Sequence, residues 1–282
     1  MLRRAILSCL AQDAAIEVIV VANGPRVCAN TLADAQELGV KLLHLPVGNV
    51  SLARYAGVKA AEGDFFCFLD DDDELLPRSI SARLNAFDPE FDIVVSNGID
   101  RTPDGHLAPS TPASVIEKID QDLIGSFLAH NWFASAAALF RTRTVPRDSF
   151  NIEAQHFEWT ILFFDLALGG YRFRYIDFPG FLRYEDNPAS ASKTIQYALA
   201  HPEAIRSIIR KHCNSGLEAN HREQLHAKLL RAYNTTAQIL LAQQDISSAW
   251  LAHLNCVRLG GWKYLSFTRH LLVRSACRNV RP

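Results

Sequence analysis

The sequence carries four consecutive aspartates, Asp70, Asp71, Asp72 and Asp73, directly after an apolar run at residues 65–69. Two carboxylates about 5 Å apart repel by about 1 kcal/mol in water and by roughly 3 kcal/mol in a partly enclosed site. A divalent cation would relieve this repulsion, and oxygen ligands without a nearby His or Cys suit Mg²⁺ or Mn²⁺. The alternative is a solvated turn whose aspartates cap the following helix.

A metal at this position predicts a particular kind of substrate. Mg²⁺ and Mn²⁺ usually bind through one or two carboxylates together with the phosphates of a substrate. The aspartates therefore favour a diphosphate-bearing substrate, whose leaving-group charge the metal would neutralise.

The elements that must position these carboxylates alternate through the first hundred residues. We expect strands at residues 16–21, 41–45, 65–69 and 92–96, and helices at residues 31–38, 50–62 and 75–87, the second capped by Asn49. Strands that are apolar throughout suit a parallel sheet covered by helices on both faces. Because ligands bind at the carboxyl ends of strands in such sheets, the aspartates stand at the expected binding edge.

The second part of the chain is irregular before it becomes helical. We expect a strand at residues 136–140, a helix at 153–168, and two neighbouring strands at 171–177 and 181–184. From about residue 195 onward the pattern is helical only. We therefore predict two domains, residues 1–195 with the α/β sheet and residues 196–282 as a helical region.

The composition argues against some partners and compartments. The formal net charge is -1 over 282 residues, which gives no support for a nucleic-acid partner. None of the six cysteines forms a CxxC pair, so we expect reduced thiols in a cytoplasmic protein. No stretch approaches the roughly 18 unbroken apolar residues that span a bilayer.

The block at residues 48–77, GNVSLARYAGVKAAEGDFFCFLDDDDELLP, resembles the metal-binding DxD segment of inverting family 2 glycosyltransferases. LRRAILSCLAQ and IEVIVVANGP stand before it in that family's order, and HFEWTILFFDLALGGYRFRYID resembles its acceptor-side helix and strand. The resemblance covers residues 2–193. It implies the α/β GT-A fold of nucleotide-diphospho-sugar transferases, a Rossmann-like, mostly parallel sheet flanked by helices, with a C-terminal helical extension.

The resemblance implies roles on the donor side. Asp70 and Asp72 would hold Mn²⁺ or Mg²⁺, with Asp73 as a substitute ligand. A guanidinium at Arg54 suits diphosphate or ribose contact, although Arg54 could equally be an exposed arginine on a helix. The expected donor-binding residues are Asn23, Arg54, Asp70 and Asp71.

Glu158 aligns with the second acid of the family's Glu-Asp pair and is the expected catalytic base. Such a base takes the proton from an acceptor hydroxyl as the oxygen attacks the anomeric carbon, in one inverting displacement. The alternative for Glu158 is a surface acid paired with a cation. His156, the fallback for the base, and Trp132 are the acceptor-side candidates. Trp132 and Trp159 could stack on a sugar ring or pack in the core.

Several positions depart from the family pattern. The strand that normally precedes residues 2–12 is missing, so either the recorded start is too late or the protein is a degraded relative, and an open sheet edge is expected. Ala22 and Asn23 replace a frequent acidic pair, and Phe157 stands where the first acid of the Glu-Asp pair is expected. Asn187 occupies a position where many relatives have a His ligand. These differences weigh on activity more than on fold.

The segment at residues 262–278, WKYLSFTRHLLVRSACR, mixes aromatic and apolar residues with cations, and no acid follows Asp245. A basic amphipathic helix of this kind can make a peripheral contact with an anionic membrane surface, here the inner face of the membrane. The alternative is a packed helix with solvated arginines.

Together these residues predict a metal-dependent, inverting glycosyltransferase that moves a sugar from a nucleotide-diphosphate donor to a hydroxyl. A UDP-sugar is the expected donor, and a saccharide or lipid-linked saccharide is the expected acceptor. One alternative is a non-catalytic relative that serves as a binding or scaffold protein. A nucleotidyltransferase on a similar sheet would need a glycine-rich, basic phosphate loop after the first strand, and the sequence has none.

Overall fold

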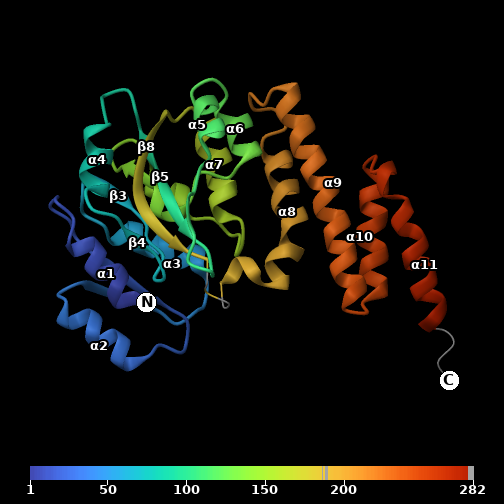
Figure 1. Cartoon of the computed structure of the whole chain (residues 1–282), viewed down its shortest axis with the longest axis horizontal. Helices are drawn as coiled ribbons and strands as arrows, with labels where there is room; N and C mark the ends of the chain where they lie inside the picture. Colours follow the sequence, from blue (N-terminus) through green and yellow to red (C-terminus); the bar gives the residue numbers. More distant parts are fainter. Residues whose placement is uncertain (186, 188–189, 279–282) are drawn as a thin grey trace. The chain divides into compact units, whose positions relative to one another are not determined.

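The computed structural model describes residues 1–185, 187 and 190–278. Contacts divide the chain into two compact units, residues 1–187 and residues 188–282. The predicted domain boundary near residue 195 falls at the start of α8 (Ile195–Lys211), the first long helix of the second unit. The strands and helices that carry the candidate site all lie in the first unit (Figure 1).

Two sheets form the centre of the first unit. The smaller one pairs β1 (Ile19–Asn23) in parallel with β2 (Lys41–Leu45). The larger one has the strand order β3-β7-β5-β8-β4, with β6 paired to β5. Its strands are β3 (Phe65–Cys67), β4 (Glu74–Leu75), β5 (Ile93–Arg101), β6 (Leu107–Pro109), β7 (Ala138–Arg141) and β8 (Phe173–Tyr184). Within the described residues, β1 and β3 each have a partner strand on one edge only.

The strand directions are mixed, so the expectation of a mostly parallel sheet is wrong. β5 and β8 run parallel, whereas β7 runs antiparallel to both β3 and β5, β4 to β8, and β6 to β5. A strand that is covered by helices on both faces is apolar whether it pairs in parallel or antiparallel with its neighbours. Its hydrophobicity therefore does not predict the strand direction. The α/β class itself is confirmed.

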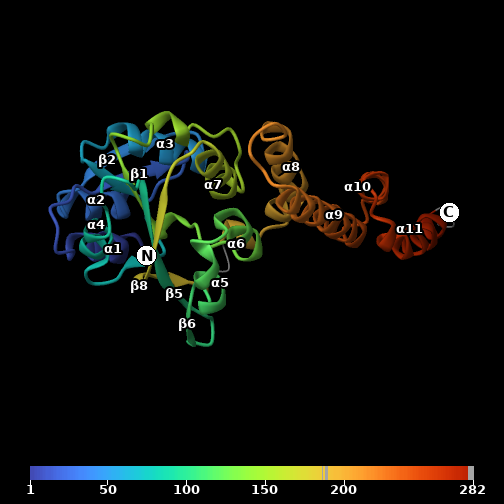
Figure 2. The same cartoon turned by 90° about the horizontal axis from the view of Figure 1, so that it is seen from above.

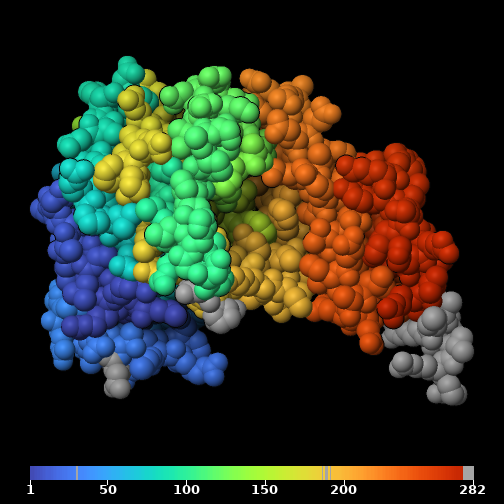
Figure 3. Space-filling model, viewed as in Figure 1, coloured from blue at the N-terminus to red at the C-terminus, as the bar shows by residue number. Residues whose placement is uncertain are grey.

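Helices flank both sheets. They are α1 (Leu2–Leu10), α2 (Ala29–Glu37), α3 (Val50–Ala60), α4 (Ser79–Asn85), α5 (Ala113–Ile119), α6 (Leu123–Ala129) and α7 (Glu158–Leu168). α3 packs against β1 (Figure 2), and α1 and α2 lie side by side on the surface, in blue in Figure 3. Asn49 caps α3 as predicted, because its side chain accepts a hydrogen bond from the Leu52 N–H (3.1 Å).

Two segments differ from their predicted form. The helix expected at residues 75–87 begins only at Ser79, because Leu75 belongs to β4 and Pro77 disfavours helical geometry in the residue before it. The two strands expected at residues 171–177 and 181–184 are one strand, β8, whose register on β5 shifts around Asn97. Neither feature is local, since β4 exists only through its pairing with β8.

An aromatic core joins the larger sheet to α6 and α7. Phe133, Phe140 and Phe163 are fully buried, and Phe127 stacks on Phe163 with ring centroids 3.8 Å apart. Phe66 in β3 stacks on Phe140 at 5.1 Å. Aromatic pairs of this kind contribute roughly 0.5–1.5 kcal/mol each beyond their burial. The core therefore fixes β3, the strand that leads to the aspartates.

The second unit consists of packed helices. α9 (Ala219–Ala242) packs against α8 and against α10 (Ile246–Arg258), and α10 packs against α11 (Ser266–Arg278) (Figure 1). A short 3₁₀ turn, η4 (Trp262–Tyr264), stands between α10 and α11. The buried side of α10 consists of Ala249, Ala252, His253 and Cys256. The described part of this unit contains no strand, as the sequence predicts.

Candidate functional site

Arg54 on α3 lies between two carboxylates. Its Nη2 atom is 2.9 Å from Asp70 Oδ1, and its Nη1 atom donates to Glu158 Oε1. The Arg54 and Glu158 side chains are only 14% and 15% exposed. The Trp159 ring lies near the guanidinium, with its centroid 5.2 Å from Arg54 Cζ. A predicted donor residue, a predicted metal ligand and the predicted base therefore meet at one point.

Three elements bring this cluster together. The Asn49 cap fixes the start of α3, the chain leaving β3 supplies Asp70, and the first turn of α7 supplies Glu158. Phe157, directly before Glu158, has a left-handed backbone (φ 62°), which is rare for a bulky side chain and turns the chain into α7. The N-terminal end of the α7 dipole also favours a carboxylate at Glu158.

The carboxylates of Asp70 and Glu158 keep the Arg54 guanidinium charged. Burial lowers the pKa of Arg54, but the Asp70 and Glu158 carboxylates outweigh burial and raise that pKa above its ordinary value. Arg54 is therefore charged, and its ion pair orients the Glu158 carboxylate. The ion pair occupies Glu158 Oε1, so a base role for Glu158 uses Oε2, or Oε1 once the guanidinium turns toward another anion.

The two predicted metal ligands, Asp70 and Asp72, each have a hydrogen-bond partner. Asp70 Oδ2 accepts a hydrogen bond from Ser135 Oγ (3.0 Å), and Asp72 Oδ2 accepts one from Asn187 Nδ2 (2.9 Å). Partial burial, together with the charges of Asp72 and Asp70, raises the pKa of Asp71. Nowhere in the described residues do three metal-ligating side chains converge. A cation at Asp70 and Asp72 would therefore take further ligands from water and from substrate, as Mg²⁺ commonly does.

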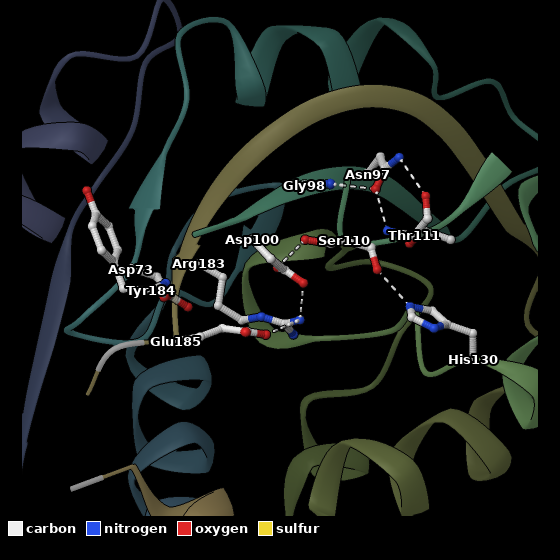
Figure 4. A network of polar contacts seen from close by, with 10 residues as sticks. All are labelled: Asp73, Asn97, Gly98, Asp100, Ser110, Thr111, His130, Arg183, Tyr184 and Glu185. Carbon is white, nitrogen blue, oxygen red and sulfur yellow. Dashed lines mark hydrogen bonds and ion pairs between the residues drawn. The ribbon is translucent and has the colours of Figure 1, made fainter. Parts of the chain in front are cut away.

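Asp73 is the most buried of the four aspartates and contacts the end of β8. Asp73 is only 6% exposed. Its Oδ1 atom accepts a hydrogen bond from the Tyr184 N–H (3.1 Å) at the end of β8 (Figure 4). Burial, followed by the charge of Asp70, raises the pKa of Asp73 to about 7. This geometry favours a structural role for Asp73 over that of a substitute metal ligand.

The first helix supports the aspartate loop from outside. Arg4 Nη2 donates to the Asp72 carbonyl oxygen (2.6 Å), and Arg4 Nε is 2.9 Å from Glu74 Oε1. Ser8 Oγ accepts a hydrogen bond from the Leu75 N–H (3.0 Å). The spacing of the polar residues in α1 does not by itself reveal these contacts.

Asn23 and His156 are the remaining predicted donor-side and acceptor-side residues. Asn23 Oδ1 accepts a hydrogen bond from the Asn49 N–H (2.9 Å), so the side chain supports the start of α3. His156 is half-buried and stands two residues before Glu158. Donor contact by Asn23 and acceptor contact by His156 stay predictions.

Trp132 lies in the core. It is 3% exposed, its Nε1 donates to Ser126 Oγ (3.1 Å), and its ring packs edge-on against Phe163. Its burial favours the core-packing alternative for Trp132, and a sugar contact by this residue stays a prediction. Trp159 likewise packs by the Arg54 guanidinium.

A polar network that the sequence pattern did not reveal joins the ends of β5 and β8 (Figure 4). Asp100 Oδ2 accepts from Arg183 Nη2 (2.6 Å), and Asp100 Oδ1 accepts from Ser110 Oγ. The His130 ring forms a hydrogen bond with the Ser110 carbonyl oxygen (2.7 Å). The sequence signal for this network is the presence of charged residues, Asp100 and Arg183, near the ends of two strands. Since Arg183 precedes Tyr184, the network holds the strand end that binds the last aspartate.

This architecture, with aspartates at the end of a buried strand, is that of a glycosyltransferase with the GT-A fold. A family model described as glycosyl transferase family 2 matches residues 1–165, more than half of the chain, and the chain belongs to this family. The family, the fold and the enzyme class predicted from the sequence are thereby confirmed.

Solved structures extend the comparison. One similar structure is that of S. aureus TarS, residues 1–349, in complex with UDP-GlcNAc, which is 16% identical in sequence. The match covers 90% of this chain and 76% of that chain, with a TM-score of 0.63. The mannosyltransferase PcManGT from Pyrobaculum calidifontis, in complex with GDP-Man and Mn²⁺, is 15% identical, with 99% and 83% covered and a TM-score of 0.49. A comparison with curated proteins finds no match. At such identities, the likeness to TarS shows the fold.

Proposed function

We propose that the protein transfers a sugar from a nucleotide-diphosphate donor to an acceptor hydroxyl, with inversion at the anomeric carbon. The observation that carries the proposal is the position of Arg54 between Asp70 and Glu158. The TarS neighbour, solved with UDP-GlcNAc, favours a UDP-sugar as the donor. Mn²⁺ or Mg²⁺ at Asp70 and Asp72 would neutralise charge on the departing diphosphate.

The donor end of the site depends on exchange of anions at Arg54. A guanidinium binds phosphate oxygens through two parallel hydrogen bonds, and such charge-assisted bonds are strong. A donor diphosphate can therefore replace a carboxylate as the partner of Arg54. Asp71 and Asn23 complete the proposed set of donor contacts.

The same exchange would free the base. Once Arg54 turns to the diphosphate, both oxygens of Glu158, rather than Oε2 alone, can take the acceptor hydroxyl proton. The hydroxyl oxygen then forms a bond to the anomeric carbon, the bond from that carbon to the diphosphate oxygen breaks, and the proton moves to Glu158. The buried ion pair thus couples donor arrival to activation of the base.

The proposed acceptor is a saccharide or a lipid-linked saccharide, with His156 on the acceptor side. In the part of the chain that the structure describes, no helix is long and apolar enough to cross a bilayer. We include in the proposal a cytoplasmic location with a peripheral contact of the C-terminal helix at the inner membrane face, which would bring a lipid-linked acceptor within reach.

A non-catalytic binding or scaffold protein is the second candidate. It is favoured by the engagement of Glu158 with Arg54, because a buried ion pair of this kind also fits a purely structural role for the carboxylate. The two candidates differ in whether a donor can compete for the guanidinium.

Calorimetric titration of UDP, with and without Mn²⁺, separates these candidates. We expect binding that requires the metal in the natural protein and is lost in an Asp70→Ala/Asp72→Ala variant. A Glu158→Gln variant is the matched control, since it should keep UDP binding and lose transfer. If UDP, GDP and dTDP all fail to bind with metal present, the donor site is absent and the non-catalytic alternative stands.

A further inference from the structure

A hollow of about 220 Å³ lies on the helical unit, along α9 and beside the start of α11. It is smaller than the roughly 300–1,000 Å³ of sites for drug-sized ligands, so it suits a single ring-sized group. All of its lining belongs to the second unit, whereas every residue of the donor site belongs to the first. The lining residues are Asn234, Gln238, Tyr264, Ser266, Phe267 and His270.

The hollow offers hydrogen bonds to a ligand. Asn234 and Gln238 stand one turn apart on α9, so both amides face the same side of the helix. Asn234 Oδ1 is buried and has no hydrogen-bond partner among the described residues. Since this oxygen is closed to solvent, the exposed Gln238 amide is the group that offers a ligand hydroxyl both a donor and an acceptor.

The hollow also offers aromatic surface. The Phe267 and His270 rings stack with centroids 5.9 Å apart and an interplanar angle of 20°. Tyr264, in η4, adds a third ring with a hydroxyl group. Rings with polar tips and flat apolar faces suit a ligand that is apolar on one face and polar around its rim.

The charges narrow the class of ligand. None of the six lining residues is a lysine, arginine, aspartate or glutamate. Phosphate and carboxylate groups are recognised mainly through Arg and Lys, so a nucleotide or a free anion is a poor match. A neutral sugar ring supplies hydroxyl donors and acceptors around its edge and C–H groups on its faces, which matches the amides and the aromatic rings together.

We propose that this hollow binds one neutral sugar unit of a glycan, at a site separate from the donor site. Binding of the sugar does not depend on transferase activity. Its use, as an anchor for the acceptor or product chain, rests on the proposed function. The helical unit would then contribute to holding the glycan rather than to the chemistry of transfer.

Saturation-transfer NMR tests the site with the methyl glycosides of glucose, galactose, mannose and N-acetylglucosamine. We expect at least one glycoside to receive saturation from the full chain, and its affinity to fall about fivefold in Gln238→Ala, the loss expected for one hydrogen bond. Tyr264→Ala should weaken it further. Gln243→Ala is the matched control, because this exposed glutamine ends the same helix outside the hollow and should leave binding unchanged.

The Asp70→Ala/Asp72→Ala variant distinguishes the two sites. Glycoside binding that survives this double substitution lies outside the donor site and supports the proposal, whether or not UDP binds. Absence of saturation transfer for all four glycosides, or transfer that persists in both Gln238→Ala and Tyr264→Ala, would overturn it. Gln238 is exposed, so its truncation removes little packing, and an unchanged melting temperature identifies a folded variant.

Discussion

At the scale of single residues, Arg54 is the side chain on which the site depends. It neutralises two carboxylates that would otherwise face each other across a largely buried gap. Such an arrangement is costly to break from one side, because removal of the cation leaves buried charge without a partner. Stability and donor binding should therefore respond to the same substitution.

Arg54→Ala should lower the free energy of unfolding by about 1–3 kcal/mol. This is less than the loss expected when a fully buried ion pair is broken, because Asp70 is 44% exposed. Denaturant unfolding measures this change. Arg210→Ala is the control, since Arg210 and Glu203 form an ion pair whose side chains are 65% and 61% exposed and should contribute little. Equal effects of the two substitutions would contradict a structural role for the Arg54 pairs.

Asp73 should make stability depend on pH. Its pKa of about 7 in the folded protein exceeds the value near 3.9 of an unfolded aspartate, so the folded state binds the proton more tightly. The stabilisation is present below about pH 4 and is lost as the pH rises through about 7. Asp73→Asn should remove this dependence and raise stability at pH 8 by roughly 2–4 kcal/mol.

Urea unfolding between pH 4 and pH 8, in buffer with a chelator, measures the difference between the natural protein and Asp73→Asn. Carboxylates far from Asp73 contribute equally to both proteins and cancel, so the difference reports Asp73 together with its coupling to Asp70 and Asp72. A difference that stays constant with pH would show that Asp73 is charged throughout and that its burial does not shift its pKa.

At the scale of elements, the fit between β5 and β8 positions the loop that carries the aspartates. Gly98 in β5 has no side chain, and a Cβ there would lie 2.2 Å from Phe181 Cζ, a ring that is 3% exposed in β8. The close approach of these two strands therefore requires glycine at this position. The same pairing holds Tyr184 against the last aspartate.

Gly98→Ala should destabilise the protein by about 2–3 kcal/mol through overpacking, as measured by thermal unfolding. Gly216→Ala is the control, because nothing lies within 4 Å of the added Cβ and no positive φ is required there. A second change, Phe181→Leu, should recover part of the loss in the double variant. Failure of that rescue would argue that the cost comes from the backbone and not from the ring.

Elements with strong local signals were predictable, and elements made by distant pairing were not. β2 occupies residues 41–45 as predicted, and α3 begins at the predicted Asn49 cap. The sequence does not predict β4 as a strand, because its two residues form a strand only when β8 lies beside them. The Arg54 contacts join residues 104 positions apart, so the sequence could name the residues but not the ion pair.

At the scale of the whole molecule, the helical unit exposes apolar and basic side chains on α10, η4 and α11. α10 buries one side against α9 and exposes Leu251 and Leu254 on the other, with Arg258 one turn further on. Trp262 is 67% exposed and Leu272 is 57% exposed. No acid follows Asp245 in the sequence, whereas the exposed cations of this surface are Arg258, Lys263, Arg269 and Arg274.

This surface should bind vesicles that contain an anionic lipid. Tryptophan and leucine insert at the boundary of headgroups and acyl chains, and each cation near an anionic surface contributes roughly 1 kcal/mol. We expect sedimentation with phosphatidylglycerol vesicles, about tenfold weaker after Arg269→Ala/Arg274→Ala and weaker again at high salt. Trp262→Ala should also reduce it, whereas Leu107→Ser, a comparably exposed residue on β6, should not.

The competing explanation is that a second copy of the chain covers the same surface. Dimer formation would depend on protein concentration and would be disrupted by Trp262→Ala, yet it would be indifferent to the lipid. Two like-charged surfaces also repel, so four cations without acids oppose pairing with a copy and favour an anionic partner. Equal sedimentation with neutral and anionic vesicles, or none with either, would contradict membrane contact and leave self-association, measured by analytical ultracentrifugation, as the explanation of the exposed apolar side chains.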